Sequence, residues 1–459
     1  MSLAYDAIII GAGQAGPSLA GRLTSAGRRV AFVERKLFGG TCVNTGCTPT
    51  KTMVASAYAA HLARRASDFG VHLQGPLTVD LKAVKARTDA IVSNSRNGVE
   101  RSLSTMPNCT VYRHAARFLS AREVQVGSDV INAPQIFINV GGRPAIPPMP
   151  GVDRVPYLTS TTLLELETLP AHLVVVGGSY VGLEFAQMFH RFGSEVTVVE
   201  MGHRLVRHED EDVSQAILEI LQAEGLHFRL GAECISLAGS AEHISVGVNC
   251  RDGEPAVEGS HVLLAVGRSP NTHDLGLSEA GVETDKHGFI LVDDQLRTNV
   301  DGIWALGDCN GQGAFTHTAY NDFEIVAANL LDNDPRRVSD RIHAHALYID
   351  PPLAQIGMTE AELRRSGRPA LIGTRPMTKV SRALEKGESQ GFMKVLVDAQ
   401  TRLILGASIL GTGGDEAIHC ILDTMYAKAP YTTLQRAVHI HPTVSELIPT
   451  VLGALKPLV

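Results

Sequence analysis

The chain has 459 residues, of which 44% are hydrophobic and 19% charged, so it can bury sizeable cores in about three domains of roughly 150 residues. Forty-one basic residues against 48 acidic ones give a formal net charge of −7, with no basic block, which disfavours nucleic acid or an anionic membrane as a partner. The first residues lack a secretory signal pattern, and no apolar run reaches the ~20 residues of a membrane helix. We therefore expect a cytoplasmic protein.

A glycine-rich turn follows the first apolar run. Gly11, Gly13 and Gly16 are spaced Gly-x-Gly-x-x-Gly, a helical pattern comes next, and a second apolar run ends in Glu34. In this order Gly11 permits the tight turn, Gly13 lets the backbone approach a pyrophosphate, and Gly16 lets helix and strand pack closely. Glu34 can accept hydrogen bonds from ribose hydroxyls. The segment predicts a dinucleotide site.

The same order recurs in the middle of the chain, between Gly177 and Gly182, with Ser179 in place of the second glycine. An ordinary turn without a ligand is the alternative, and it is weakened because the whole unit occurs twice. Two dinucleotides, or one dinucleotide and a flavin dinucleotide, are implied. Glu200 ends the next strand and favours NADH, since a carboxylate accepts from a 2′-hydroxyl and repels a 2′-phosphate; NADPH is the alternative, because basic residues follow.

Two of the seven cysteines, Cys42 and Cys47, lie close together where a glycine-rich loop runs into a helical pattern. Residues five apart in a continuous helix rise about 7.5 Å, beyond the ~7 Å Cα separation of a disulfide, so the backbone between them must unwind if they bond. Gly46 and Pro49 suit such a break, and a helix start beside Lys51 favours a thiolate. We predict a redox pair; a zinc site and two unrelated thiols are the alternatives. The remaining cysteines are expected to be inert: Cys109, Cys234, Cys250, Cys309 and Cys420.

Residues 39–51, GGTCVNTGCTPTK, resemble the active-site signature of the flavoprotein pyridine nucleotide-disulfide oxidoreductases, which include dihydrolipoamide dehydrogenase, glutathione reductase and mercuric reductase. The likeness extends over both glycine turns, ALGD at 305–308 and HPTVSE at 441–446. It implies an α/β fold with two Rossmann-like domains, for FAD and for NAD(P), and a C-terminal α+β dimerisation domain that forms a homodimer. The implied divisions are 1–150 and 270–337 for FAD, 151–269 for NAD(P), and 338–459 for dimerisation.

The resemblance also implies roles for single residues. Cys47 would be the thiolate that faces the flavin, and Cys42 the outer thiol that exchanges with substrate. His441, supplied by the other subunit and oriented by Glu446, would be the acid/base, since a held histidine can shuttle the thiol proton. The other implied positions are Lys51 near the flavin and paired with Glu184, Glu34 at the FAD ribose, Asp308 at the ribityl chain, Tyr180 as a gate of the nicotinamide pocket, and Thr41, Gly142 and Gly267 at the cofactors.

The electron acceptor is left open between two classes. A small disulfide or dithiol substrate is the first expectation; reduction of a soft metal ion, Hg²⁺ or Cu²⁺, is the alternative, because thiolates select soft metals. Residues 381–384 and 391–394 look like mercuric reductase, whereas the C-terminal sequence GALKPLV holds no vicinal cysteines of the kind that pass Hg²⁺ inward. A non-catalytic flavoprotein scaffold is the second alternative, disfavoured because both cysteines are retained.

Two pairs of histidines have i, i+2 spacing, His343 with His345 and His439 with His441. Each pair would share one face of a strand, because side chains alternate along a strand. A second metal site is conceivable there, but we expect histidines that pack at a subunit interface.

Overall fold

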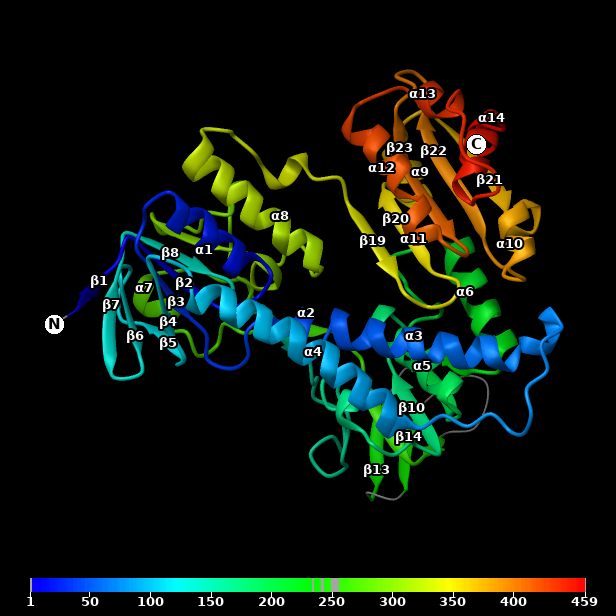
Figure 1. The fold of residues 1–459 in the computed structure, drawn as a ribbon, viewed down its shortest axis with the longest axis horizontal. Helices are drawn as coiled ribbons and strands as arrows, with labels where there is room; N and C mark the ends of the chain where they lie inside the picture. The colour runs from blue at the N-terminus through cyan, green and yellow to red at the C-terminus, as the bar shows by residue number, and fades with distance from the viewer. Residues whose placement is uncertain (1, 233–234, 241–242, 249–255, 459) are drawn as a thin grey trace.

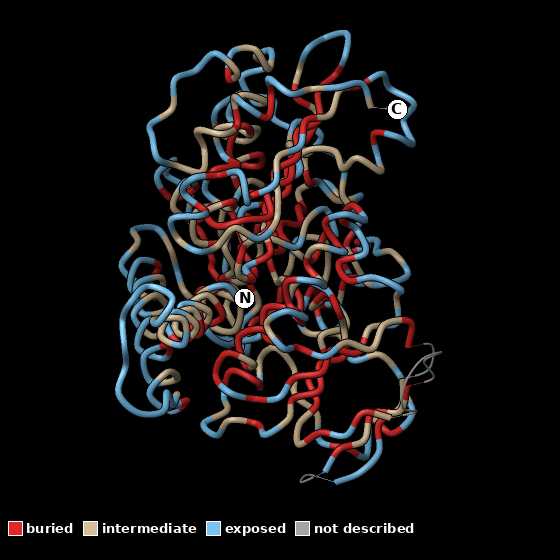
Figure 2. Tube along the Cα trace, turned by 90° about the vertical axis from the view of Figure 1, so that its right-hand side faces the viewer, coloured by how far each residue is buried: buried red, intermediate tan, exposed pale blue. Residues whose placement is uncertain are grey.

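The computed structural model describes residues 2–232, 235–240, 243–248 and 256–458. Figure 1 shows three bodies, each built on its own main sheet: an N-terminal body, a middle body, and a C-terminal body in which the chain ends. Buried segments run through these sheets and exposed loops surround them (Figure 2). No helix in the described ranges is long and apolar enough to cross a membrane.

The N-terminal body is built on a five-stranded parallel sheet in the order β18-β8-β2-β3-β4. Ala7 and Ile9 of the central strand pack with the helices on one face, while Ile8 and Ile10 pack on the other face against a four-stranded sheet. Because both faces are covered, the strands are continuous apolar runs. The elements are β2 (Ala7–Ile10), α1 (Ala15–Ser25), β3 (Val30–Val33), β4 (Cys109–Tyr112), β8 (Gln135–Ile138), β18 (Ile303–Ala305) and α8 (Thr316–Ala327), and the covering sheet is β1 (Leu3–Ala4), β7 (Asp129–Asn132), β6 (Glu123–Val126) and β5 (Ala116–Phe118).

The middle body repeats this plan with a four-stranded parallel sheet, β12-β11-β10-β16. Leu173 and Val175 pack with the helices, and Val174 and Val176 pack against a three-stranded antiparallel sheet. The elements are β10 (His172–Val176), α5 (Tyr180–Phe192), β11 (Glu195–Glu200), α6 (Glu211–Glu224), β12 (His227–Leu230) and β16 (His261–Leu264), with β13 (Ser236–Gly239), β14 (Ile244–Gly247) and β15 (Ala256–Gly259) in the smaller sheet.

The connections between these two bodies lie side by side. β9 (Gly142–Pro144), where the chain leaves the N-terminal body, pairs antiparallel with β17 (Arg268–Pro270), where it returns. Two long helices, α3 (Cys47–Arg64) and α4 (Leu81–Ser104), pack on one another and run from the N-terminal body across to the middle one (Figure 1).

The C-terminal body is a six-stranded antiparallel sheet in the order β19-β20-β23-β22-β21-β24, with helices packed on it. The predicted fold class, two Rossmann-like α/β units followed by an α+β domain, is confirmed. The elements are β19 (Ala344–Leu347), β20 (Leu353–Gly357), α9 (Glu360–Ser366), β21 (Ala370–Pro376), α10 (Ser381–Glu385), β22 (Phe392–Asp398), β23 (Ile404–Leu410), α11 (Gly414–Ala417), α12 (His419–Tyr426), α13 (Tyr431–Gln435), α14 (Ile448–Gly453) and β24 (Lys456–Pro457).

Candidate active site

The helix that carries the two predicted redox cysteines is broken between them. Cys42 lies in α2 (Gly40–Asn44), and Cys47 is the first residue of α3. A side chain at Gly46 would place its Cβ 2.8 Å from the carbonyl oxygen of Thr41, so only glycine allows the chain to pass here. The unwinding expected from the sequence is therefore present, and the two free thiols hydrogen-bond to one another.

The two thiols differ strongly in acidity. The pKa of Cys47 is lowered to about 6, chiefly because Cys42 donates a hydrogen bond to it, then because of the Thr316 hydroxyl at 3.1 Å and the charge of Lys51. The hydrogen bond to Cys47 and burial raise the pKa of Cys42. Near neutral pH the reduced pair thus holds one thiolate, on Cys47, and one thiol, on Cys42.

Lys51 forms an ion pair beside the cysteines. Its Nζ donates to Oε2 of Glu184 at 2.6 Å and lies 4.6 Å from the centre of the Tyr348 ring. The Glu184 side chain is only 7% exposed, and its other oxygen accepts the backbone N–H of Tyr348 at 3.0 Å. Because a buried carboxylate needs a partner charge, this pair fixes Lys51 one turn of α3 beyond Cys47. The pair predicted from the resemblance is formed.

Both glycine turns need glycine at their first and third positions. A Cβ at any of these four positions would overlap a backbone oxygen, which a real side chain cannot do. The close approaches are Gly11 to Asn139 (2.3 Å), Gly16 to Gly11 (2.4 Å), Gly177 to Ala265 (2.4 Å) and Gly182 to Gly177 (2.0 Å). At the second position of the first turn, a Cβ on Gly13 would come no closer than 3.2 Å to the Asn139 side chain, and Ser179 fills the same position of the second turn.

The two predicted ribose-binding acids are held in the same way. Glu34 accepts the backbone N–H groups of Ala12, at 2.8 Å, and Lys36, at 2.7 Å. Glu200 accepts those of Gly178, at 2.6 Å, and Gly202, at 2.7 Å. Each acid is thus fixed beside its glycine turn, where a dinucleotide ribose is expected.

Around the first turn the residues present fit a flavin dinucleotide. Arg268 joins three of the predicted cofactor positions: its guanidinium lies 3.5 Å from Asp308, donates to the Gly142 carbonyl at 2.6 Å, and lies 3.5 Å from the Thr41 hydroxyl. Burial raises the pKa of Asp308. Close by in sequence to Cys42, Oδ1 of Asn44 is buried without a partner, an acceptor that a bound cofactor could satisfy. Gly267 precedes Arg268 with φ +119°, and a Cβ at this glycine would meet no atom within 4 Å.

The predicted acid/base dyad is formed at the surface of the C-terminal body. Nδ1 of His441 lies 2.9 Å from Oε2 of Glu446, while the His441 side chain is 73% exposed. In the described part of the chain no hydrogen bond or ion pair joins His441 to either cysteine. Two apolar side chains beside it are also exposed, Val438 at 99% and Ile440 at 81%. The segment therefore presents an apolar surface and a histidine outward together.

The prediction that each histidine pair shares a strand face is wrong for His439 and His441. Residues 437–444 belong to no helix or strand, because this segment pairs with none of the described strands. His345 does lie in β19, and the ring centres of His343 and His345 are 5.2 Å apart. Over the described residues no group of three or more His, Cys, Asp or Glu side chains is arranged to hold a metal.

The other described cysteines are buried or half-buried. Burial raises the pKa of Cys309 to about 12 and that of Cys109 to about 11, and it also raises the pKa of Cys420. Thiols of this kind stay protonated and unreactive at neutral pH. Cys234 and Cys250 lie outside the described residues.

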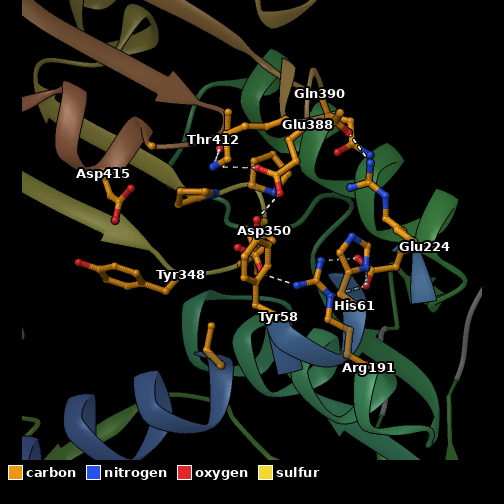
Figure 3. A pocket seen from close by; sticks show the side chains of 18 of the residues that line it. Tyr58, His61, Arg191, Glu224, Tyr348, Asp350, Glu388, Gln390, Thr412 and Asp415 are labelled. Atoms are coloured by element: carbon orange, nitrogen blue, oxygen red, sulfur yellow. Dashed lines mark hydrogen bonds and ion pairs between the residues drawn. The ribbon is translucent and has the colours of Figure 1, made fainter. Parts of the chain in front are cut away.

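A cavity of about 510 Å³ lies where α3, the middle body and the C-terminal body meet (Figure 3). Arg191 donates to Glu224 and Asp350 within it, and Tyr58 donates to Glu388. The Arg191–Asp350 ion pair joins the middle and C-terminal bodies, and the Tyr58–Glu388 hydrogen bond joins α3 to the C-terminal body. Its lining includes Tyr348 but neither redox cysteine.

Sequence reasoning missed several side chains that hold the site. Thr316 and Arg268 contact the predicted residues from elsewhere in the chain. Tyr180, predicted as a gate, is held by Glu209 and His345. Arg268 could have been predicted, because it directly follows the predicted position Gly267. No local sequence pattern marks Thr316 or Glu209.

Comparisons with known proteins agree with this arrangement. The pyridine nucleotide-disulphide oxidoreductase family matches residues 5–322, and the dimerisation domain of that family matches residues 343–452. The chain is 36% identical to RclA of Escherichia coli (strain K12), a probable pyridine nucleotide-disulfide oxidoreductase, over 98% of this chain and 99% of that one. It is 33% identical to mercuric reductase of Staphylococcus aureus over 95% of this chain and 81% of that one. Identity to dihydrolipoyl dehydrogenase of Chlamydia pneumoniae is 32%, over 97% and 96%.

Among solved structures, the Cu(II) complex of the HOCl-induced flavoprotein disulfide reductase RclA from Escherichia coli is similar, with a TM-score of 0.89 and 34% identity over 99% of each chain. The likeness thus spans all three bodies as well as the site. Members of the matched family bind FAD and a pyridine nucleotide. Because the two family matches together cover most of the chain and RclA is 36% identical over nearly its whole length, the chain belongs to the pyridine nucleotide-disulphide oxidoreductase family.

Proposed function

We propose that the protein passes electrons from NADH, through FAD and the Cys42–Cys47 disulfide, to a small disulfide substrate. The observation that carries the proposal is the unequal thiol pair: a low-pKa Cys47, hydrogen-bonded to a protonated Cys42 at a break in the helix. Such a pair can form and break a disulfide without large backbone motion. The negative charge lies on Cys47, whereas Cys42 is the thiol that would exchange with the substrate.

The cofactors are assigned to the two glycine turns. FAD would be held by residues 1–150 and 270–337, at the first turn, Glu34, Thr41, Gly142 and Asp308. The nicotinamide nucleotide would be held by residues 151–269, at the second turn, Glu200 and Gly267. When bound, FAD supplies a two-electron carrier between nicotinamide and disulfide. Residues 338–459 would form the dimerisation domain.

Exchange with the substrate is a thiol–disulfide reaction. Cys42 loses its proton to His441 of the partner subunit, and its sulfur attacks one sulfur of the substrate disulfide to form a mixed disulfide. The first substrate thiolate leaves and takes that proton. The Cys47 thiolate then attacks the Cys42 sulfur, which closes the internal disulfide again and releases the second substrate thiolate, which takes a proton from solvent. The substrate gains two electrons, and the cysteine pair loses them.

The need for a base follows from the acidity of the pair. Because the pKa of Cys42 is raised, this thiol is not a nucleophile at neutral pH without proton removal. His441 with Glu446 is suited to that task, and its exposure beside Val438 and Ile440 suits supply to a second subunit.

The experiment has two stages. Anaerobic addition of NADH should bleach the flavin absorbance, and a panel of lipoamide, glutathione disulfide and related disulfides should then restore it. Cys42→Ser should still accept hydride but lose disulfide turnover, whereas Cys109→Ser, a half-buried thiol in β4, should keep it. Equal turnover by Cys42→Ser would overturn the exchange role, and a flavin that stays oxidised would favour a scaffold.

The nucleotide preference rests on Glu200. Its carboxylate is fixed beside the second turn and would accept from the 2′-hydroxyl of NADH. We expect a higher kcat/KM for NADH than for NADPH; a clear advantage of NADPH contradicts the assignment.

Reduction of a soft metal ion is the second candidate. It is favoured by the paired sulfur atoms, by relatives described as mercuric reductases, and by a similar structure described as a Cu(II) complex. Including Hg²⁺ and Cu²⁺ in the acceptor panel separates the two functions, because an enzyme of this kind would consume NADH with the metal ion and not with the disulfides.

A further inference from the structure

One residue of the C-terminal body, Tyr348, contacts both members of the ion pair beside the cysteines. Its backbone N–H donates to Oε1 of Glu184 at 3.0 Å, and the centre of its ring lies 4.6 Å from Nζ of Lys51. The pair itself is closed by the bond from Nζ to Oε2 of Glu184, at 2.6 Å. Tyr348 therefore binds the acid through its backbone and the base through its ring.

The backbone of Tyr348 is anchored, while its ring projects outward. Its neighbours Leu347 and Ile349 are 0% and 1% exposed, whereas Tyr348 is 37% exposed. Leu347 ends β19 and pairs with Leu353 of β20, so the sheet fixes the main chain at this point. Figure 3 shows the ring pointing away from the side chains around Arg191. The ring is thus held at its base and free to contact a cation at its face.

The Lys51 ammonium needs such a contact more than its partner does. The Lys51 side chain is 34% exposed, against 7% for Glu184. In the part of the chain that the structure describes, Glu184 is the one hydrogen-bond partner of Nζ. A lysine has a flexible stem, so a single bond leaves its ammonium free to swing toward solvent. The face of an aromatic ring attracts a cation, and Tyr348 thus supplies a second point of attachment.

The placement of this ammonium matters at Cys47. Lys51 lies one turn after Cys47 on α3, and its charge lowers the pKa of that thiol, whereas the charge of Glu184 raises it. Because the two charges oppose one another, their net effect on the sulfur depends on where the ammonium is held. The remaining groups that face the sulfur or the Tyr348 ring are Cys42, Thr316, Asp415 and Glu416.

We propose that Tyr348 is a positioning residue, whose ring and backbone N–H together hold the Lys51–Glu184 pair so that the lysine charge stays beside the Cys47 sulfur. The inference rests on the proposed function, since it takes Cys47 as the member of the redox pair that carries negative charge. The aromatic face is the part of the side chain that matters, and the hydroxyl is not required.

The test follows alkylation of Cys47 by iodoacetamide against pH, on FAD-loaded protein reduced with dithiothreitol and freed of it. Tyr348→Leu should raise the midpoint by about half a pH unit, because the ammonium is no longer held. Tyr348→Phe keeps the ring face and should restore the wild-type midpoint. In a Lys51→Met background, Tyr348→Leu should cause no further rise, because the ring acts through the lysine.

Tyr431→Leu is the matched control, since the Tyr431 ring also faces a cation, the Arg402 guanidinium at 5.7 Å, but in α13. It should leave the midpoint of Cys47 unchanged. An unchanged midpoint in Tyr348→Leu overturns the proposal, as does an equal rise in Tyr348→Phe or a rise that persists without Lys51. Tyr348→Met repeats the test if Tyr348→Leu does not fold. Bleaching of the wild-type flavin by NADH tests the proposed function separately, because the alkylation needs no turnover.

Discussion

The acidity of Cys47 in the reduced protein is the property on which the proposed chemistry depends most directly. Its pKa is lowered from the ordinary 9.0 to about 6. At pH 7 this makes about 90% of the group a thiolate, against about 1% for an unperturbed thiol. The largest cause is the hydrogen bond from Cys42, so Cys42→Ala is the informative perturbation.

The size of the effect follows from the bond that is lost. A hydrogen bond to a charged group contributes about 1.5–3 kcal/mol, and 1.36 kcal/mol corresponds to one pKa unit. Cys42→Ala should therefore raise the pKa of Cys47 to about 7–8. Thr316→Val removes a smaller contribution and should raise that pKa less.

The assay is the pH dependence of alkylation of the reduced protein by iodoacetamide, with the Cys47 peptide followed by mass spectrometry. Alkylation of the wild type should rise through a midpoint near pH 6 and level off above it, because only the thiolate reacts. The peptides of Cys109 and Cys309, whose pKa values are raised, serve as internal controls. The reasoning is refuted if Cys42→Ala leaves the midpoint near 6, or if the wild-type midpoint lies above pH 8.

Three further predictions test the frame of the site. Gly46→Ala should drive its Cβ into the Thr41 carbonyl and slow closure of the disulfide, measured by thiol counting after diamide; Gly98→Ala, with no atom within 4 Å, should have no such effect. Lys394→Met should leave the buried carboxylate of Asp210 without its partner charge and cost about 3–5 kcal/mol in urea unfolding, and unchanged stability would contradict this. Glu34→Gln should weaken FAD retention on gel filtration, and full retention would count against its role.

The parts of the site that sequence predicted are those fixed by short-range geometry. The glycine turns, Glu34, Glu200 and the cysteine pair each sit where a strand or helix begins or ends, so their spacing alone places them. The ion pair of Lys51 with Glu184 joins two helices far apart in sequence, and only the family resemblance could supply it.

What sequence could not supply is the set of contacts between segments that lie far apart in the chain. Thr316 reaches Cys47 across 269 positions of the chain, and no local pattern marks it. For the histidine pairs, sequence reasoning predicted a shared strand face that is not formed in both cases. Side chains with i, i+2 spacing share a face only where the segment is a strand, which requires a neighbouring strand to pair with. His345 lies in β19, but the segment with His439 and His441 is unpaired.

The two dinucleotide units share one more feature, which explains why chemistry gathers where it does. In each unit the segment after the acid folds back onto the glycine turn: the Gly39 N–H donates to the Ala12 carbonyl at 3.0 Å, and the Val206 N–H donates to the Gly178 carbonyl at 2.9 Å. In the first unit that segment leads within a few residues to Cys42. In the second it leads to the glutamate that holds Tyr180. Backbone bonds made by the turns themselves therefore hold the segment that leads to Cys42 against the first turn, and the segment that leads to Glu209 against the second.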